Sequence, residues 1–321
     1  MVPVAIVGGA GYTGGELIRI LLNHPFVDLT SVVSESQQGK LISSIHGDLT
    51  GDTDMTFSSK IDGQPEVIFL CTGHGKAKEF MSRTKLDKTT RVIDLSMDYR
   101  IEDGSHDFVY GLPELNRKRI KKSRRIANCG CFATAIQLAL LPLANAKLLN
   151  DEIHVNAITG STGAGQALSD TLHFSWRTNN ISIYKPFGHQ HVPEIRQSLT
   201  QLYPDFKADL NFIPVRGNFT RGIYSTVYTK CDLNLDEVQR LYTKYYRAEA
   251  FTKIVSENPD LKQVVNTNKA LLYLEKHGDK LLVVSMLDNL LKGASGQAVQ
   301  NMNIMYSWPE DSGLKLKGVV F

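Results

Sequence analysis

The stretch that decides the fold lies near the N-terminus, where residues 3–17 read PVAIVGGAGYTGGEL. The apolar run at residues 3–7 predicts a short buried strand, and the glycines that follow it predict a tight turn. Apolar residues within 17–22 then recur at helical spacing, up to Pro25. Strand, glycine turn and helix in this order are typical of a nucleotide-binding α/β fold, because the helix N-terminus offers free N–H groups to phosphate.

Gly9, Gly11 and Gly14 fit the dinucleotide fingerprint, in which glycines allow a tight turn, close approach of a pyrophosphate and close packing of helix on strand. The residue that closes the second strand distinguishes NAD from NADP, because an acidic side chain there would repel a 2′-phosphate. That residue is Ser34, with Lys40 a short loop away, so the sequence favours NADP(H). The predicted cofactor-binding residues here are Gly8, Gly9, Ala10, Gly11, Tyr12, Thr13, Gly14 and Ser34.

Length and charge narrow the class of protein. A chain of 321 residues exceeds the usual size of one core, which predicts two domains. The formal net charge of +3 is too small for a general binder of nucleic acids or membrane surfaces. No stretch approaches the roughly 18 apolar residues of a membrane span, and the N-terminus does not resemble a signal peptide. We therefore expect a cytoplasmic protein with a small-molecule ligand.

The four cysteines, at positions 71, 129, 131 and 231, are not arranged as a disulfide framework or a zinc site. A chain of this length without a secretion signal is expected to keep its thiols reduced. Cys129 and Cys131 are one residue apart rather than two, and no second cysteine pair accompanies them. We expect no metal ion.

The remaining pattern predicts two kinds of sheet. Buried strands at 29–33, 67–71 and 92–95 alternate with helices and indicate a parallel, doubly wound sheet. Later strands are longer and alternate in polarity, which indicates an α+β domain on an antiparallel sheet. These strands are expected at 153–159, 210–215, 222–229 and 280–286, with a helix at 235–246. We predict a Rossmann domain over 1–131, completed by a C-terminal helical segment at about 293–321, and a second domain over 132–292.

The segment NCGCFAT, residues 128–134, places a thiol where a strand ends and a helix begins. A helix N-terminus stabilises negative charge, so a cysteine there is partly a thiolate and can act as a nucleophile. Beside a nucleotide-binding fold we assign this role to Cys131. Cys129 is interpreted as a small buried apolar residue.

Proton transfer to support such a thiol requires a group that titrates near neutral pH, and histidine does so. His189 and His191 lie two residues apart in the segment HQHVPEI, beside a carboxylate that could orient one of them. A metal bound by this pair would lack an obvious third ligand, so acid/base chemistry is the sharper interpretation.

Arginine side chains near glycine-bounded loops predict an anionic substrate, because a guanidinium binds phosphate and carboxylate bidentately. Arg216 and Arg221 flank such a loop, and Arg100 ends the segment DLSMDYR at 94–100.

Taken together, these motifs resemble the N-acetyl-gamma-glutamyl-phosphate reductase family of arginine biosynthesis, nearly over the whole chain. The segments that carry the resemblance are 8–17 (GGAGYTGGEL), 94–100, 110–114 (YGLPE), 128–134, 161–165 (STGAG), 189–195, 214–217 (PVRG) and 288–303. The family belongs with the aspartate-semialdehyde and glyceraldehyde-phosphate dehydrogenases. The resemblance therefore implies a Rossmann domain paired with an α+β catalytic domain of their type.

The resemblance also implies an activity, namely NADPH-dependent reduction of an N-acyl-gamma-glutamyl phosphate to the semialdehyde through a thioester. Cys131 would be the nucleophile and His191 the acid/base, with His189 as the alternative. Ser161, Gly163 and Asn289 would join the cofactor site, and Arg100, Asn128, Arg216 and Arg221 would bind substrate. A homodimer or homotetramer is expected. Two other readings stay open, a dehydrogenase of the aspartate-semialdehyde type and a non-catalytic nucleotide-binding redox sensor, and the acyl group is open too.

Overall fold

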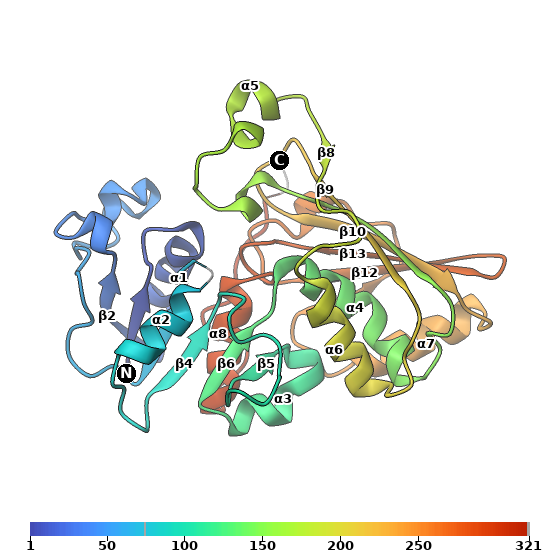
Figure 1. Ribbon diagram of the computed structural model, residues 1–321, viewed down its shortest axis with the longest axis horizontal. Helices are drawn as coiled ribbons and strands as arrows, with labels where there is room; N and C mark the ends of the chain where they lie inside the picture. The colour runs from blue at the N-terminus through green and yellow to red at the C-terminus, as the bar shows by residue number, and fades with distance from the viewer. Residues whose placement is uncertain (74, 320–321) are drawn as a thin grey trace. The chain divides into compact units, whose positions relative to one another are not determined.

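The computed structural model describes residues 1–73 and 75–319, and the chain forms two compact units (Figure 1). The first unit contains Met1–Cys129 and Ala294–Lys315, and the second contains Gly130–Gly293 and the chain from Leu316 onward. The C-terminal segment predicted to complete the Rossmann domain runs on to residues 320–321, which lie outside the described residues. No helix in the described part of the chain is long and apolar enough to cross a membrane.

The first unit is built on a parallel sheet of six strands, in the order β2-β1-β3-β4-β6-β5. Its strands are β1 (Val2–Val7), β2 (Val27–Val33), β3 (Val67–Leu70), β4 (Arg91–Asp94), β5 (Val109–Gly111) and β6 (Arg125–Asn128). Every neighbouring pair is parallel, which confirms the doubly wound sheet predicted from the alternation of strands and helices. Short apolar strands of this kind are buried on both faces, as β3 is along its whole length.

Four helices belong to this unit: α1 (Tyr12–Leu22), α2 (Lys76–Arg83), α3 (Pro113–Lys122) and α8 (Ser295–Tyr306). Helix α8 is buried from Ser295 to Met305 although it carries several amides. Those amides are hydrogen-bonded inside the unit, since Asn301 Nδ2 donates to Gly111 O at 2.9 Å and Asn303 Oδ1 lies 3.0 Å from His24 Nε2. Because these amides are hydrogen-bonded, burial of the polar helix does not leave their polar groups unsatisfied.

The second unit is built on a mixed sheet of seven strands, in the order β11-β12-β13-β10-β7-β9-β8. Its strands are β7 (Ile153–Thr159), β8 (Ser182–Ile183), β9 (Leu210–Arg216), β10 (Ile223–Lys230), β11 (Thr252–Val255), β12 (Ala270–His277) and β13 (Lys280–Leu287). The sequence predicted an antiparallel sheet. That prediction was wrong for two strand pairs, because β7 pairs with β9 in parallel and β11 pairs with β12 in parallel. Parallel neighbours need a long crossover, and α6 (Val192–Leu202) lies in the one between β7 and β9.

One face of this sheet is covered by helices, as Figure 1 shows for α4 (Cys131–Asn145), α6 and α7 (Leu235–Tyr246). Helix α4 is at the centre, and it is buried from Phe132 to Ala144. The hydroxyls of Tyr242 and Tyr246 on α7 each donate to a carbonyl oxygen of α4 at 2.5 Å. The position of the first residue of α4 is therefore set by the core of the second unit.

Candidate active site

Cys131 is the first residue of α4, after the N-cap Gly130. No side chain caps this end of the helix, and its first turn has no acidic residue. The sulfur therefore lies at a helix N-terminus whose free N–H groups and dipole favour a negative charge. The predicted start of this helix, near Phe132, is confirmed.

His191 and Glu194 surround the residue that precedes the thiol. A Cβ atom built on Gly130 would lie 2.6 Å from His191 Cδ2, so the imidazole rests directly against this glycine. The Gly130 amide donates to Glu194 Oε2 at 3.0 Å, and Glu194 Oε1 lies 3.8 Å from His191 Nε2. Both side chains are buried. The structure thus brings a histidine and a carboxylate to the N-terminus of the helix that carries Cys131.

His189 lies beside His191, with 4.6 Å between the ring centroids. The pair is not extended, because His191 is the N-cap of α6 with helical backbone angles. The backbone N–H of His191 donates to His189 Nδ1 at 3.2 Å. Burial, together with the charge of Lys185, lowers the pKa of His189 to about 4. His189 is therefore neutral at pH 7 and serves as an acceptor that holds the backbone of His191.

The lowered pKa of His189 predicts a pH dependence of stability. Between its ordinary pKa of about 6.5 and the folded value of about 4, the unfolded chain binds the proton and the folded chain does not. The free energy of unfolding should therefore fall as the pH is lowered through this window, by up to roughly 3 kcal/mol from this group. Urea unfolding at pH 7.0, 5.5 and 4.5 should show a shallower decline in His189→Asn than in the wild type. An equal decline in both proteins would contradict the assignment.

Tyr184 and Arg216 form a second part of the site, and the sequence analysis missed the tyrosine. Burial raises the pKa of Tyr184, and the nearby charge of Cys131 raises it further. The Arg216 guanidinium lies over the Tyr184 ring, 4.7 Å from its centroid. Arg216 Nε is buried, and its N–H donates to no hydrogen-bond acceptor in residues 1–73 and 75–319. A cation with an unused donor near the thiol is suited to an anionic ligand.

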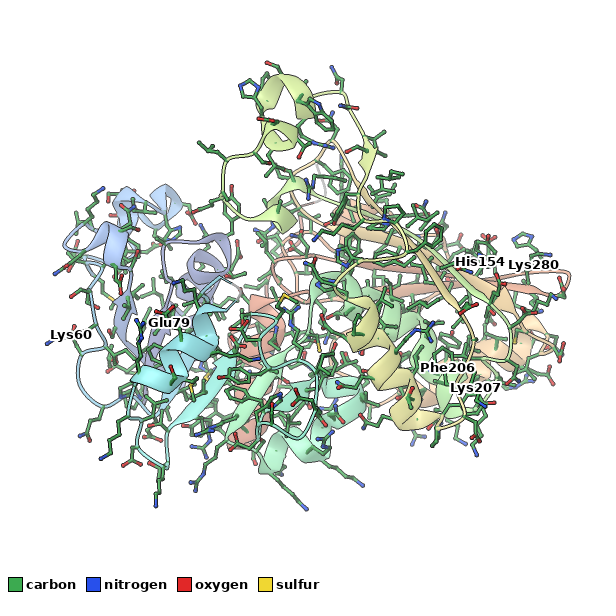
Figure 2. The ribbon with its side chains drawn as sticks, viewed as in Figure 1. Lys60, Glu79, His154, Phe206, Lys207 and Lys280 are labelled. Atoms are coloured by element: carbon green, nitrogen blue, oxygen red, sulfur yellow. The ribbon has the colours of Figure 1, made fainter. Side chains whose placement is uncertain are left out.

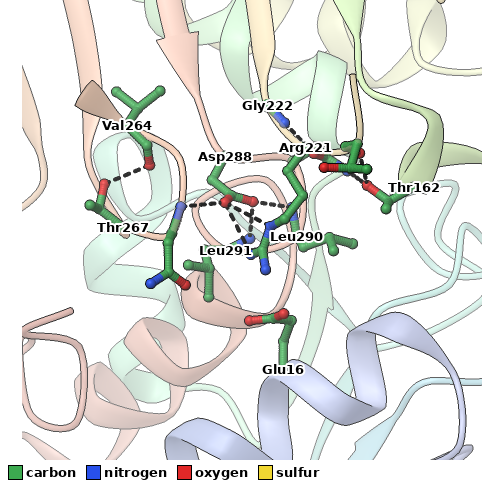
Figure 3. Close-up of polar contacts among 12 residues, drawn as sticks. Glu16, Thr162, Arg221, Gly222, Val264, Thr267, Asp288, Leu290 and Leu291 are labelled. Atoms are coloured by element: carbon green, nitrogen blue, oxygen red, sulfur yellow. Dashed lines mark hydrogen bonds and ion pairs between the residues drawn. The ribbon is translucent and has the colours of Figure 1, made fainter. Parts of the chain in front are cut away.

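Arg221 is engaged differently, because it pairs with the fully buried Asp288 (Figure 3). Its Nε donates to Asp288 Oδ2 at 3.0 Å, and the same carboxylate accepts the backbone N–H groups of Leu290 and Leu291. This carboxylate fixes the loop that ends at Gly293. A Cβ atom on Gly293 would lie 2.8 Å from Cys131 Cβ, so the loop passes directly beside the thiol residue.

Asn289 connects this loop to the 3-10 turn at Ser161–Ala164, which contains Ser161 and Gly163. Asn289 Oδ1 accepts the Gly222 N–H at 2.7 Å, and its Nδ2 donates to Thr162 Oγ1 at 3.0 Å. The side chain of Asn289 therefore holds two loops of the second unit together.

In the first unit, the glycine turn is made at Gly8, one position before the fingerprint assigned from the sequence. Gly8 has φ +88°, and a Cβ atom there would lie 2.6 Å from Cys71 O. A Cβ on Gly14 would lie 2.7 Å from Gly8 O, whereas a Cβ on Gly11, the N-cap of α1, would make only an ordinary contact with Gly8 O, at 3.8 Å. Ser34 follows β2 directly, and Gly8 and Gly9 both donate backbone N–H groups to the neighbouring Val33 O.

Arg100 and Asn128 are buried in the first unit and bonded to its backbone. Arg100 Nε donates to Asn128 O at 2.9 Å, and its Nη2 donates to Leu95 O at 3.0 Å. Asn128 Nδ2 donates to Ala294 O, also at 3.0 Å. These bonds tie the ends of β4 and β6 to the start of α8. In the described residues, no group of three or more His, Cys, Asp or Glu side chains is placed to hold a metal ion.

Comparison with known proteins adds two family matches and a set of relatives. Residues 3–123 match a family model described as semialdehyde dehydrogenase, NAD binding domain, and residues 131–289 match one described as semialdehyde dehydrogenase, dimerisation domain. The chain is 58% identical to the N-acetyl-gamma-glutamyl-phosphate reductase of Parabacteroides distasonis and 57% identical to that of Phocaeicola vulgatus. Each comparison covers 100% of both chains.

Solved structures share the fold at much lower identity. Aspartate semialdehyde dehydrogenase II from Vibrio cholerae is similar with a TM-score of 0.72 and 17% identity, over 96% of this chain and 98% of that one. The aspartate semialdehyde dehydrogenase from Candida albicans, solved with NADP, is similar with a TM-score of 0.69 and 12% identity, over 96% and 99% of the two chains. At these identities the likeness establishes the fold and no more.

Proposed function

Because this chain belongs to the N-acetyl-gamma-glutamyl-phosphate reductases of the semialdehyde dehydrogenase family, we propose that it reduces an N-acyl-gamma-glutamyl phosphate to the semialdehyde with NADPH and releases phosphate. The observation that carries this proposal is the position of Cys131 at the N-terminus of α4, with His191 against the preceding glycine. A thiolate with a neighbouring imidazole is the arrangement that thioester chemistry requires.

The chain's own residues perform the covalent steps. The Cys131 thiolate attacks the acyl carbon, a C–S bond forms, and the C–O bond to phosphate breaks. NADPH, when bound at the glycine turn of the first unit, would supply the hydride for reduction of the thioester carbon. His191 gives a proton to the oxyanion and takes it back when the C–S bond breaks, which releases the aldehyde and restores the thiolate. Glu194 orients the imidazole and the Gly130 amide, and His189, neutral at pH 7, holds the backbone of His191.

The glycine turn of the first unit fits the diphosphate of NADPH. Gly8 and Gly14 leave no room for a Cβ atom, and Gly11 is the N-cap of α1, so the turn leads into the N-terminus of that helix. Ser34 carries no charge to oppose a 2′-phosphate. We assign the cofactor to the first unit, with its boundary near residue 131 and α8 as its last helix, and the covalent chemistry to residues 132–292 together with Cys131.

Among the arginines, Arg216 is the one that we assign to the anionic groups of the substrate. Its Nε is buried without a described hydrogen-bond partner, and its guanidinium lies over Tyr184, which the charge of Cys131 also influences. Arg221, Arg100 and Asn128 are bonded within the protein, so we give them the role of holding the loops that border the site. The cysteine content, four residues that form no disulfide framework, is compatible with a cytoplasmic enzyme.

A substrate panel tests this function. Purified protein is supplied with NADPH and either N-acetyl-gamma-glutamyl phosphate, N-succinyl-gamma-glutamyl phosphate or aspartyl phosphate, and the absorbance at the nicotinamide wavelength is followed. Oxidation of NADPH with a glutamyl substrate and none with aspartyl phosphate is expected. Turnover with aspartyl phosphate alone would favour the aspartate-semialdehyde reading. No turnover from folded protein that binds NADPH would favour a redox sensor.

The second unit also has a surface suited to a second copy of this chain, in keeping with its match to a dimerisation domain. On the sheet face opposite α4, several side chains are partly exposed, although Val284 and Met286 are buried there in an apolar cluster. Strand register places Ile213, Asn156, Thr226, Val284 and Tyr273 in one row across this face. Lys230, Lys280 and His277 lie at one end of it. A neutral centre with charges at the margin is typical of a protein interface.

Edge strand β8 extends this surface, because Ile183 pairs with Val215 and is 61% exposed. The segment before it exposes further apolar side chains, namely Leu168, Phe174 and Ile181. Exposed apolar groups this close together mark an interaction site. We propose that the open sheet face and β8 form the contact of a homodimer, which is the minimal unit of the homodimer or homotetramer expected from the family.

Charge placed on the open face should separate the dimer. Tyr228 is 42% exposed and stacks on His154, with 4.7 Å between ring centroids. His154 is labelled in Figure 2. Tyr228→Glu should weaken self-association by roughly 30-fold or more, as loss of an aromatic interface anchor does. Lys207→Glu, an exposed charge change in the loop after α6, is the control. Sedimentation velocity across a dilution series should show monomers for the first variant only; equal masses for both would rule out this face.

A further inference from the structure

We propose that His46 is a positioning residue of the dinucleotide-binding loop, which aims the Ala10 N–H at the diphosphate of the cofactor. The inference rests on the proposed function, since it assigns a new residue to that cofactor site. His46 lies 32 positions beyond Gly14, in the connection between β2 and β3. It belongs to no motif that the sequence analysis identified.

The inference starts from a hydrogen bond to the loop itself. His46 Nε2 lies 2.8 Å from the carbonyl oxygen of Gly9, and the imidazole is buried. A carbonyl oxygen only accepts, so Nε2 carries the proton and donates it. The tautomer of His46 is thereby fixed by the loop that it holds.

The geometry of the peptide bond turns this contact into control of the neighbouring amide. Gly9 O and the Ala10 N–H belong to one planar trans peptide and point in opposite directions. When His46 holds Gly9 O on its own side, the Ala10 N–H points away from His46. Gly9 has no Cβ, so the backbone torsions next to this peptide have little steric restriction of their own. The bonds from Gly9 N–H to Val33 O and from Gly11 N–H to Gly8 O hold the peptides on either side, and the His46 donor acts on the Gly9 carbonyl between them.

His46 is itself held rigidly against α1. A Cβ atom on Gly15, in the first turn of α1, would lie 2.6 Å from His46 Cε1, so the ring fills the space that this glycine leaves. Arg19 on α1 donates to Asp48 through Nε and Nη2, which fastens the turn after His46 to the helix. The ring of Phe57 closes the other side, 6.2 Å away between centroids. The Gly15 backbone, the Arg19–Asp48 ion pair and the Phe57 ring together restrict the movement of the imidazole.

The test compares His46→Leu, which removes the donor but keeps the bulk, with His46→Gln, which keeps an N–H donor at similar reach. His24→Leu is the matched control, because His24 is equally buried in the same unit but bonds to Asn303 on α8. The dissociation constant of NADPH is measured by fluorescence, and the KM values for NADPH and for acyl phosphate are measured separately. Thermal unfolding without cofactor monitors stability.

We expect His46→Leu to weaken NADPH binding about 10- to 100-fold, the effect of losing one well-oriented bond to a charged phosphate. The KM for acyl phosphate should change by less than about 2-fold, and His46→Gln should recover most of the binding. His24→Leu should lower thermal stability and leave the NADPH affinity unchanged. Gly15→Ala, which pushes the imidazole away, should weaken binding in the wild type and add little in His46→Leu.

Two results would overturn the inference. One is wild-type NADPH affinity in His46→Leu, and the other is an equal loss of affinity in His46→Leu and His24→Leu, which would reduce His46 to a stability role. These outcomes differ from failure of the proposed function, in which the wild-type protein itself would not bind NADPH and both proposals would fall together.

Discussion

Replacing Cys131 with serine is expected to lower turnover by at least about 10³-fold while NADPH still binds. The hydroxyl of serine stays protonated at neutral pH, so the N-terminus of α4 has no anion to stabilise and no thioester forms. The measurement combines steady-state oxidation of NADPH with a cofactor titration of the same preparation. Mass spectrometry of wild-type protein mixed with acyl phosphate alone should show the acyl group on Cys131.

Cys129→Ser is the control for this prediction, because Cys129 is buried one residue before the N-cap of α4 and has no role in the mechanism. We expect this variant to keep most of its activity. If Cys129→Ser were inactive and Cys131→Ser active, the nucleophile would be misassigned. Selective alkylation of Cys131 without loss of turnover would lead to the same conclusion.

Replacing His191 with asparagine should lower kcat by about 10²- to 10⁴-fold, the usual contribution of a general acid/base. The imidazole lies against Gly130, whereas the pKa of the neighbouring His189 is lowered to about 4 by burial and by the charge of Lys185. The pH profile of kcat should lose one of its two limbs in this variant. NADPH affinity should stay within about 2-fold of the wild type.

His189→Asn is the matched control, because the asparagine oxygen can accept the His191 N–H in place of Nδ1. A modest loss of activity with an intact pH profile is expected. If instead His189→Asn removed the limb and His191→Asn kept it, the roles of the two histidines would be exchanged.

Local pattern predicted much of this molecule. The strand, turn and helix at residues 2–22, the helix that begins at Cys131 and four strands of the second unit, β7, β9, β10 and β13, follow from apolar periodicity and glycine placement, which act within a few residues. Strands β8, β11 and β12 were not predicted. The position of Cys131 at the start of a helix was predictable for the same reason, since a helix N-terminus is a local feature.

Contacts between distant parts of the chain could not be predicted in this way. The parallel pairing of β7 with β9 depends on the crossover through α6 and not on the alternation within either strand. Tyr184 follows an edge strand of two residues. Its place in the candidate site is recognised only from its contact with Arg216 and from the effect of the Cys131 charge on it. The fingerprint glycine was misplaced by one position because Gly8 and Gly9 look alike in sequence, while only Gly8 has a positive φ.

The burial of helix α4 bears on how such an enzyme changes its substrate. A nucleophile at the tip of a helix that is buried from Phe132 to Ala144 cannot move by even an ångström unless the interior of the second unit repacks. Longer or shorter acyl chains must then be accommodated elsewhere. If Arg216 binds the substrate as proposed, we expect substitutions at Tyr184, whose ring lies under the Arg216 guanidinium, to change the choice of acyl group without moving the sulfur of Cys131.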